Sequence, residues 1–595
     1  MKKTATILLM LLLFSAISNA QTSFDNLWLE VEKLEVDNLP KSALNSVEKI
    51  YTKAEKENNA SQLIKSLLYK SKFSLILEED AQLKVINNFK KHISNSRFPT
   101  KNVLQNMLAN LYWQYFTQNR YKFYNRTKTV NKVDIIDFRT WDLNTLFEEI
   151  HAYFKASLES SEKLQDVNIH DFAAILSIEK DSKKYRPTLY DFLANNALEF
   201  YKSSETSITR PSYKFILDTP SFIGDYKTFL KLKLETKDTL SLQFNALKIY
   251  QNLIKFHSKE NNFNALADID IHRLQFVKQH TTIKNKQPIF LSTLEFSKEN
   301  FNKNDISGLY AFEIAKIHRE KSENNAAITI CDKIIKKYPK SLGAKNCTIL
   351  KKQIKAKSLS ITVEKNIPTN TNTRMLVNYK NIDHLFFTAY SITNDQLYKF
   401  NRLYKSKEKV AFINALQKAN NWNSKLRNEN DYLQHSTEII IPKFDNGKYL
   451  IVSSIHKNLK SNEVFGTASM QATNLTLIEN TFEGKYTYQV VSRNTGKPIK
   501  NVVIHLKNNS NNEDTFINKR LTTDKKGFAS FKSRNYYHNV AIEVKTKNDI
   551  ATFGNYYLSD YSRVHNENKE IENSIIKPFI FTDRSIYRPG QTVYF

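Results

Sequence analysis

The chain has 595 residues, 41% apolar and 12% aromatic, so it is long enough for several domains and has the side chains to fill their cores. Only 10 glycines and 12 prolines are present, which favours a helix-rich globular protein and argues against glycine-rich phosphate-binding loops. The net charge of +28 comes from lysines and arginines spread along the chain among many asparagines, which indicates a solvated basic surface and no nucleic-acid partner.

Residues 1–20 are typical of an export signal. Lys2 and Lys3 come first, an apolar run follows over Ile7–Phe14, and small residues stand at the positions read by a signal peptidase, Ser18–Ala20. The apolar run is too short to span a bilayer, and no later stretch approaches about 18 consecutive apolar residues. The sequence therefore predicts an exported protein, periplasmic, extracellular or on the cell surface, that does not span the membrane.

Residues 21–357 show the apolar period of amphipathic helices. Asn58 and Asn59 predict a corner between two apolar stripes, and Ser322–Asn325 predicts a similar corner near the end of the region. Each corner would join two helices into a hairpin of the tetratricopeptide kind. Such hairpins stack into a solenoid with a long concave surface, where we expect a protein partner to bind. The first two stripes are Leu44, Val47, Ile50 and Ala54, then Leu63, Ile64, Leu67 and Leu68.

The chain contains two cysteines, Cys331 and Cys347, on either side of a predicted helix corner at Tyr338–Ser341. Antiparallel helices joined by this corner would bring both cysteines to a similar height. In an oxidising compartment they are a candidate disulfide, and two buried thiols are the alternative. Neither cysteine stands in a metal-ligand spacing, and no cofactor is predicted.

The apolar period changes from helical to alternating near Leu359, and residues 358–480 are predicted to form an antiparallel β-sandwich. A helical stretch between Asp395 and Asn420 interrupts the strands. Asp445–Gly447 is predicted to be a hairpin turn. The predicted strands include Met375–Tyr379, Leu385–Tyr390, Ile439–Ile441 and Tyr449–Val452.

Residues 481–558 form a second predicted β-sandwich. The run T-G-K-P-I-x-N-V over Thr495–Val502, followed by T-D-x-x-G-F over Thr523–Phe528, resembles small transthyretin-like or carboxypeptidase-regulatory modules. That resemblance implies a structural spacer. A polar linker is predicted over residues 559–575.

Residues 576–595 predict a strand, a turn and the start of another strand. Pro589 presets φ for the second position of a type II turn, and Gly590 tolerates the positive φ of the third. The run T-D-R-x-I-Y-R-P-G-Q-T-V resembles the opening of the bait-proximal macroglobulin domain in bacterial alpha-2-macroglobulins. Because a lone hairpin is unstable, we expect this chain to be the front of a longer polypeptide. The residues that carry the motif are Asp583, Arg584, Tyr587, Arg588, Pro589 and Gly590.

Two earlier segments strengthen this resemblance. Tyr185–Ala194, with Pro187 predicted at a helix start, is similar to the helical front region of alpha-2-macroglobulin family proteins from Bacteroidetes-type bacteria. Pro339–Cys347, followed by the strand at Leu359–Val363, resembles the passage into a first macroglobulin domain. The resemblance implies a multidomain protein, α then β, with tetratricopeptide-like repeats followed by macroglobulin-type β-sandwiches.

The resemblance also implies a non-enzymatic inhibitor that traps proteases. Family members carry a bait segment that proteases cut, after which a collapse encloses the protease, and many add a Cys-Gly/Leu-Glu-Gln thioester. Cys331 precedes Asp-Lys-Ile and Cys347 precedes Thr-Ile-Leu, so neither is a thioester cysteine. We expect a scaffold without bait or thioester, and proteases as partners through the full-length protein.

No pattern in the sequence predicts an enzyme. His272 and His280 stand eight apart on a charged helix, and the pairs Glu78–Glu79 and Glu148–Glu149 diverge around their helices. The basic and aromatic stretch Asn119–Lys128 could stack bases, but a helix contact rimmed by cations explains it. The main alternative function is a surface adaptor or adhesin, with a helical binding region on a β-sandwich stalk; an unrecognised hydrolase is a more remote one.

Overall fold

The computed structural model divides into two compact units. The first, here called the helical unit, comprises residues 1–317 and 329–348, and the second, the β unit, comprises residues 318–328 and 349–595. The structure describes residues 24–79, 81–124, 126, 134, 136–179, 181–203, 205, 213–482, 484–533, 535–558 and 590–594. Among these residues, no helix has the length and apolarity required to cross a lipid bilayer. The predicted export signal and the predicted linker lie outside the described residues.

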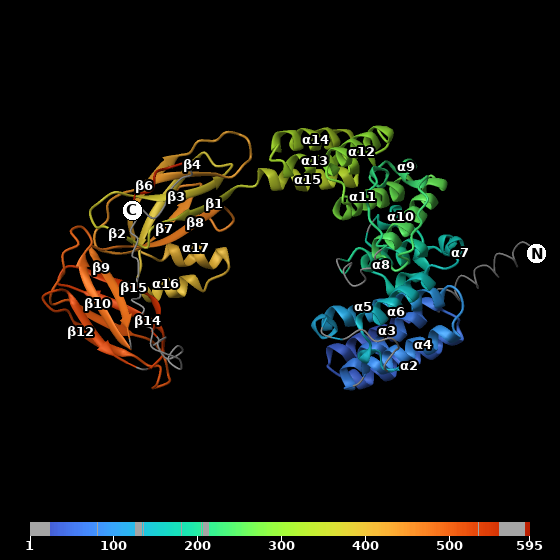
Figure 1. Cartoon of the computed structure of the whole chain (residues 1–595), viewed down its shortest axis with the longest axis horizontal. Coiled ribbons are helices and arrows are strands. Elements are labelled where there is room, and N and C mark those ends of the chain that lie inside the picture. The colour runs from blue at the N-terminus through green and yellow to red at the C-terminus, as the bar shows by residue number, and fades with distance from the viewer. Residues whose placement is uncertain are drawn as a thin grey trace, which may run out of the picture. The chain divides into compact units, whose positions relative to one another are not determined.

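The first part of the chain is helical, as its apolar period predicts (Figure 1). Residues 24–36 are helical, and short 3-10 helices lie between several of the longer elements. The labelled helices are α2 (Pro40–Lys56), α3 (Ala60–Leu77), α4 (Ala81–Asn95), α5 (Thr100–Tyr124), α6 (Leu143–Ser157), α7 (Ser161–Asp166), α8 (Leu189–Tyr201), α9 (Tyr226–Leu230), α10 (Leu242–Lys259), α11 (Phe263–His280), α12 (Lys286–Asn300), α13 (Ser307–Glu320), α14 (Asn324–Lys337) and α15 (Leu342–Lys355).

Asparagine and serine residues end and begin these helices for local physical reasons. Asn58 has a φ of 51°, a left-handed conformation that asparagine adopts more readily than most residues. The side chain of Asn59 then accepts a hydrogen bond from the Gln62 amide and caps α3. At the predicted corner Tyr338–Ser341, the hydroxyl oxygen of Ser341 accepts a hydrogen bond from the Ala344 amide at the start of α15. The helices therefore turn where the sequence predicts.

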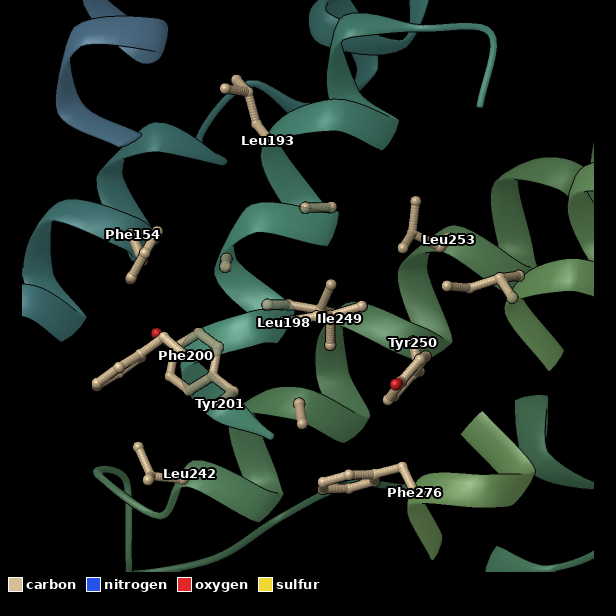
Figure 2. Packing of buried hydrophobic residues seen from close by; sticks show 14 of the residues in the cluster. Phe154, Leu193, Leu198, Phe200, Tyr201, Leu242, Ile249, Tyr250, Leu253 and Phe276 are labelled. Atoms are coloured by element: carbon tan, nitrogen blue, oxygen red, sulfur yellow. The ribbon is translucent and has the colours of Figure 1, made fainter. Parts of the chain in front are cut away.

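A continuous apolar cluster fills the helical unit. Figure 2 shows part of it, where side chains from α6, α8, α10 and α11 meet. The rings of Phe154 and Phe200 stack with their centroids 5.5 Å apart, and those of Tyr250 and Phe276 lie 5.7 Å apart. Because each helix covers its neighbour's apolar face, α8 buries nine of its 13 residues and α10 buries nine of its 18.

Antiparallel strands follow α15 and form two sheets. One sheet has the order β1-β3-β6 and the other β2-β8-β7-β4-β5, in which only the β2–β8 pair is parallel. The region that the sequence predicts to be helical contains two helices and the start of strand β5. The elements are β1 (Ser358–Thr362), β2 (Asn366–Ile367), β3 (Thr373–Lys380), β4 (His384–Ser391), α16 (Asn394–Asn401), α17 (Ser406–Asn414), β5 (Lys418–Lys425), β6 (His435–Ile441), β7 (Gly447–Ser454) and β8 (Phe465–Ala472).

Both faces of the five-stranded sheet are covered. One apolar cluster takes Met375 and Ile439 from the three-stranded sheet and Phe387 and Ile451 from the five-stranded sheet. On the opposite face a second cluster joins residues of β4 and β7 to α16 and α17. The continuous apolar run of β7 follows from this burial on both sides.

The predicted hairpin turn at Asp445–Gly447 is wrong. Strand β6 pairs with β3, whereas β7 pairs with β4 and β8, so the chain crosses between sheets at this point. Gly447 has a φ of 157°, a positive value that L side chains rarely adopt, and it is the first residue of β7. Alternating apolar residues identify strands, but they do not identify the partner of each strand.

A second pair of sheets follows, with the orders β13-β10-β9 and β12-β11-β14-β15, and one apolar cluster takes side chains from both. The predicted boundary between residues 480 and 481 falls inside β9, which pairs with β10 and therefore belongs to this second pair. The other domain limits stay predictions. The strands are β9 (Leu475–Phe482), β10 (Lys485–Ser492), β11 (Val503–Lys507), β12 (Asn518–Thr522), β13 (Phe528–Lys532), β14 (Tyr537–Lys545) and β15 (Ile550–Leu558).

Polar side chains join the two pairs of sheets within the β unit. The carboxylate of Asp549, in the β14–β15 turn, accepts hydrogen bonds of 2.8 Å from the Thr473 hydroxyl and the Asn474 amide. The Gln471 side chain accepts a 2.8 Å hydrogen bond from the Thr552 amide. These bonds connect the end of β8 and the short β8–β9 link to the β14–β15 turn and to the edge strand β15. They therefore hold the two pairs of sheets together at this point.

Candidate functional site: a groove on the helical unit

A hollow of about 680 Å³ lies among α2, α3, α4 and the start of α5. The corner before α3 lines one side, and the last turn of α4 with the loop into α5 lines the other. Leu63 and the exposed ring of Phe98 supply apolar surface. The polar lining includes four amide side chains, those of Asn58, Asn59, Asn88 and Asn95.

The charges of this groove are mixed. Lys91 and Arg97 are exposed at its edge, and Glu55 is the carboxylate among its lining residues. His92 packs edge-on against Tyr51, and burial together with the nearby Lys70 lowers the pKa of its imidazole. His92 is therefore neutral near pH 7. Amide groups that both donate and accept hydrogen bonds, beside a small apolar surface, suit an extended peptide segment better than a small ion.

The basic and aromatic stretch at the end of α5 is engaged within the helical unit. Arg120 forms a 2.7 Å ion pair with Glu205, and the Tyr124 hydroxyl donates a 2.7 Å hydrogen bond to the same carboxylate. Arg126 donates to the carbonyl oxygen of Trp141, also at 2.7 Å. Phe123 is buried. These contacts are the helix contact rimmed by cations that the sequence suggests, and residues 125, 127 and 128 lie outside the described part.

The Tyr185–Ala194 segment begins α8 with a reciprocal cap. Thr188 is the N-cap, so Pro187 precedes the cap and does not occupy the first helical position, which corrects the sequence interpretation. Asp191 accepts from both the amide and the hydroxyl of Thr188, at 3.0 and 2.8 Å, and contacts Nε2 of buried His257 at 2.7 Å. This buried acid and histidine hold α8 to α10. They have no route to a substrate, because both side chains are about 2% exposed.

The histidines and glutamate pairs considered in the sequence analysis do not gather into one site. His272 lies 3.8 Å from Asp268, whereas His280 contacts Gln243. Glu78 pairs with Lys84, and Glu149 lies 3.6 Å from Lys90. The described residues contain no group of three or more histidine, cysteine or acidic side chains placed to hold a metal ion.

Two motifs stand out in the sequence, the cysteine pair and the C-terminal turn, and the structure describes them to different extents. Cys331 and Cys347 are buried thiols whose side chains contact each other without a disulfide, so their bonding stays a prediction. Of the C-terminal motif only Gly590 is described, and its φ of 85° is the positive value that a type II turn needs at its third position. Asp583, Arg584, Tyr587, Arg588 and Pro589 lie outside the described residues.

A separate small hollow of about 40 Å³ contains His151, whose Nδ1 lies 2.9 Å from the Tyr201 hydroxyl. Burial, with a smaller effect from Lys155, lowers the pKa of His151 to about 4. Glu148, Glu205, Asp238 and Lys214 also line this hollow.

We expect His151 to make the protein less stable in mild acid. Its folded pKa lies below the value of 6.5 expected for an unfolded chain, so the unfolded state binds the extra proton as the pH falls from about 6.5 towards 4. The thermal midpoint should therefore fall more steeply between about pH 7 and pH 5 in the natural chain than in His151→Gln. Exposed His170, replaced by glutamine, is the control, and equal slopes in all three proteins would contradict the expectation.

No family model matches the chain, and no curated protein matches it. Solved structures match parts of it. A piece of native alpha-2-macroglobulin from Escherichia coli spanning domains NIE-MG1 is similar over 33% of this chain and 96% of that chain, at 10% identity and a TM-score of 0.25. A longer piece spanning domains MG0-NIE-MG1 is similar over 33% and 64%, with the same identity and TM-score.

The third match is the CARDB domain of a Pyrococcus furiosus protein, similar over 20% of this chain and 92% of that chain at 12% identity and a TM-score of 0.12. One third of the chain is thus similar to N-terminal domains of a bacterial alpha-2-macroglobulin. Because the identities and TM-scores are low, we base no functional inference on these likenesses.

Proposed function

We propose that this chain is the N-terminal scaffold of an exported endopeptidase inhibitor of the alpha-2-macroglobulin type, of the kind found in Bacteroidetes-type bacteria. In the full-length protein a bait segment, and a thioester if there is one, would lie beyond this scaffold. The helical unit would be a tetratricopeptide-like array, and each pair of sheets a macroglobulin-type or spacer β-sandwich. This role needs no catalytic group and no cofactor.

The observation that carries the proposal is the sequence run T-D-R-x-I-Y-R-P-G-Q-T-V over Thr582–Val593, which resembles the opening of a bait-proximal macroglobulin domain. The second strand predicted after the turn is not formed over residues 591–594. The positive φ of Gly590 supports the turn. The order of the chain also supports it, because helices come first and two pairs of largely antiparallel sheets follow.

The proposal is tested by incubating the full-length protein with trypsin and measuring hydrolysis of two substrates. An enclosed protease keeps its active site but cannot admit a folded protein. We therefore expect hydrolysis of a small chromogenic peptide to persist while hydrolysis of a large protein substrate is lost. Trypsin inactivated beforehand at its active site cannot cut a bait and serves as the control. It should elute separately from the inhibitor in gel filtration, whereas active trypsin should elute with it. Equal loss of both activities, or loss of neither, contradicts the proposal.

The groove among α2–α5 favours a second candidate, the surface adaptor, because its amide-rich lining suits a peptide segment of a partner protein. The same assay separates the two functions. An adaptor leaves trypsin active on both substrates. If the full-length protein is a protease trap, we propose that the helical unit contacts another protein through this groove.

A further inference from the structure

We propose that Cys331 and Cys347 form an intramolecular disulfide that joins α14 to α15 when the protein matures in an oxidising compartment. The proposal goes beyond protease trapping and relies only on the export that the proposed function includes. It also chooses between the two states that the sequence leaves open, a disulfide and a pair of buried thiols.

The two cysteines lie at matching heights on neighbouring helices. α14 ends at Lys337 and α15 begins at Leu342, so Cys331 precedes the corner by about as many residues as Cys347 follows it. Ser341 fixes the corner by capping α15 through the Ala344 amide at 3.0 Å. Both cysteine side chains are 0% exposed.

The thiols also touch. The side chain of Cys347 is hydrogen-bonded to that of Cys331, so the two sulfurs already lie within hydrogen-bond reach of each other. The surrounding backbone is tightly packed. A methyl group added at Gly343, one turn before Cys347, would lie 2.4 Å from the backbone of Gly308 on α13. Figure 1 shows α13, α14 and α15 side by side.

The chemistry of the step determines when it can occur. The two thiols lose two protons and two electrons, one S–S bond forms, and the electrons reduce the disulfide of a thiol oxidant to two thiols. The hydrogen bond to Cys331 and burial raise the pKa of the Cys347 thiol, so little thiolate exists in the folded protein. The bond therefore forms during folding, while an oxidant can still reach the sulfurs, and burial afterwards protects it from reduction.

Alkylation and mass spectrometry of the whole chain test this directly. The protein is produced with export to an oxidising compartment and purified without reductant, then unfolded with a maleimide present. We expect no label, and two labels if the unfolded protein is first reduced. The same chain produced in a reducing cytosol should take two labels without reduction, which shows that both thiols can react. Two labels on the exported, unreduced protein would overturn the proposal.

A stability measurement gives an independent reading. Reduction of the exported protein in its unfolded state, followed by refolding with reductant present, should lower its thermal midpoint by roughly 5 °C, because the bond closes a short loop in the unfolded chain. The Cys331→Ala/Cys347→Ala variant should not respond to reductant. A midpoint that is equally insensitive in the natural chain and the variant would contradict the proposal. Neither result bears on trypsin enclosure, so this inference and the proposed function fail separately.

Discussion

Replacing Asp270 with alanine is expected to lower the free energy of unfolding of the helical unit by about 3–5 kcal/mol, because it leaves a buried guanidinium without its counter-charge. Arg273 and Asp270 are both 0% exposed, one turn apart on α11, with Nη2 of the arginine 2.5 Å from the carboxylate. The loss of stability arises because the positive charge of Arg273 would be left unpaired and out of contact with water.

Several segments depend on this pair. Arg273 also donates to the carbonyl oxygens of Phe222 and Gly224, at 2.6 and 2.7 Å, and so holds the loop before α9. The hydroxyl of Tyr310, on α13, donates to Asp270 at 3.0 Å. Asp270 and Arg273 therefore tie two other segments of the helical unit to α11.

Chemical denaturation followed by circular dichroism measures the effect. Glu235→Ala is the matched control, because Glu235 and Lys233 form a 2.8 Å ion pair that is largely exposed; its change should stay within about 1 kcal/mol. The double variant Asp270→Leu/Arg273→Met removes both charges and should be more stable than Asp270→Ala alone. A loss below about 1 kcal/mol for Asp270→Ala would show that water or another group compensates the arginine.

Gly343→Ala is expected to cost about 1–3 kcal/mol despite the higher helix propensity of alanine. The added Cβ would lie 2.4 Å from the carbonyl carbon of Gly308 and 2.7 Å from its oxygen. Backbone atoms inside two helices cannot move away independently, so α13 and α15 would have to separate.

Gly308→Ala is the matched control at the same helix contact. Its nearest neighbour would be the Cγ2 methyl of Ile334 at 3.0 Å, a side-chain atom that needs to give by only a few tenths of an ångström. The gain in helix propensity then offsets much of the strain, and we expect a change within about 1 kcal/mol. Thermal unfolding of both variants checks the contrast, and similar losses in the two would contradict the proposed asymmetry.

The sequence predicts the helices and their corners because both depend on local patterns. The stripe containing Val47 and Ile50 determines a buried face, and Asn58 and Asn59 supply the left-handed residue and the cap that a corner needs. The change near Leu359 from a helical to an alternating period likewise predicts where strands begin. These features are independent of distant parts of the chain.

Features that depend on distant residues could not be predicted. Asp270 and Arg273 have the spacing of an ordinary surface ion pair, and only packing against α13 and the loop before α9 reveals that they are buried. The crossing from β6 to β7 depends on which strands pair. The groove combines the helical hairpin predicted around Asn58 and Asn59 with residues of α4 and α5. More than half of its lining residues therefore lie outside that hairpin, and no pattern in the sequence indicated them.

The central claim is that this chain is the scaffold of a protease trap and not an inhibitor in its own right. The most direct test compares residues 21–595 with the full-length protein in the trypsin assay that uses the peptide and protein substrates. The scaffold alone should leave both hydrolysis rates unchanged, whereas the full-length protein should block only the protein substrate. Inhibition of both substrates by the isolated scaffold, or no effect of the full-length protein, would contradict the account.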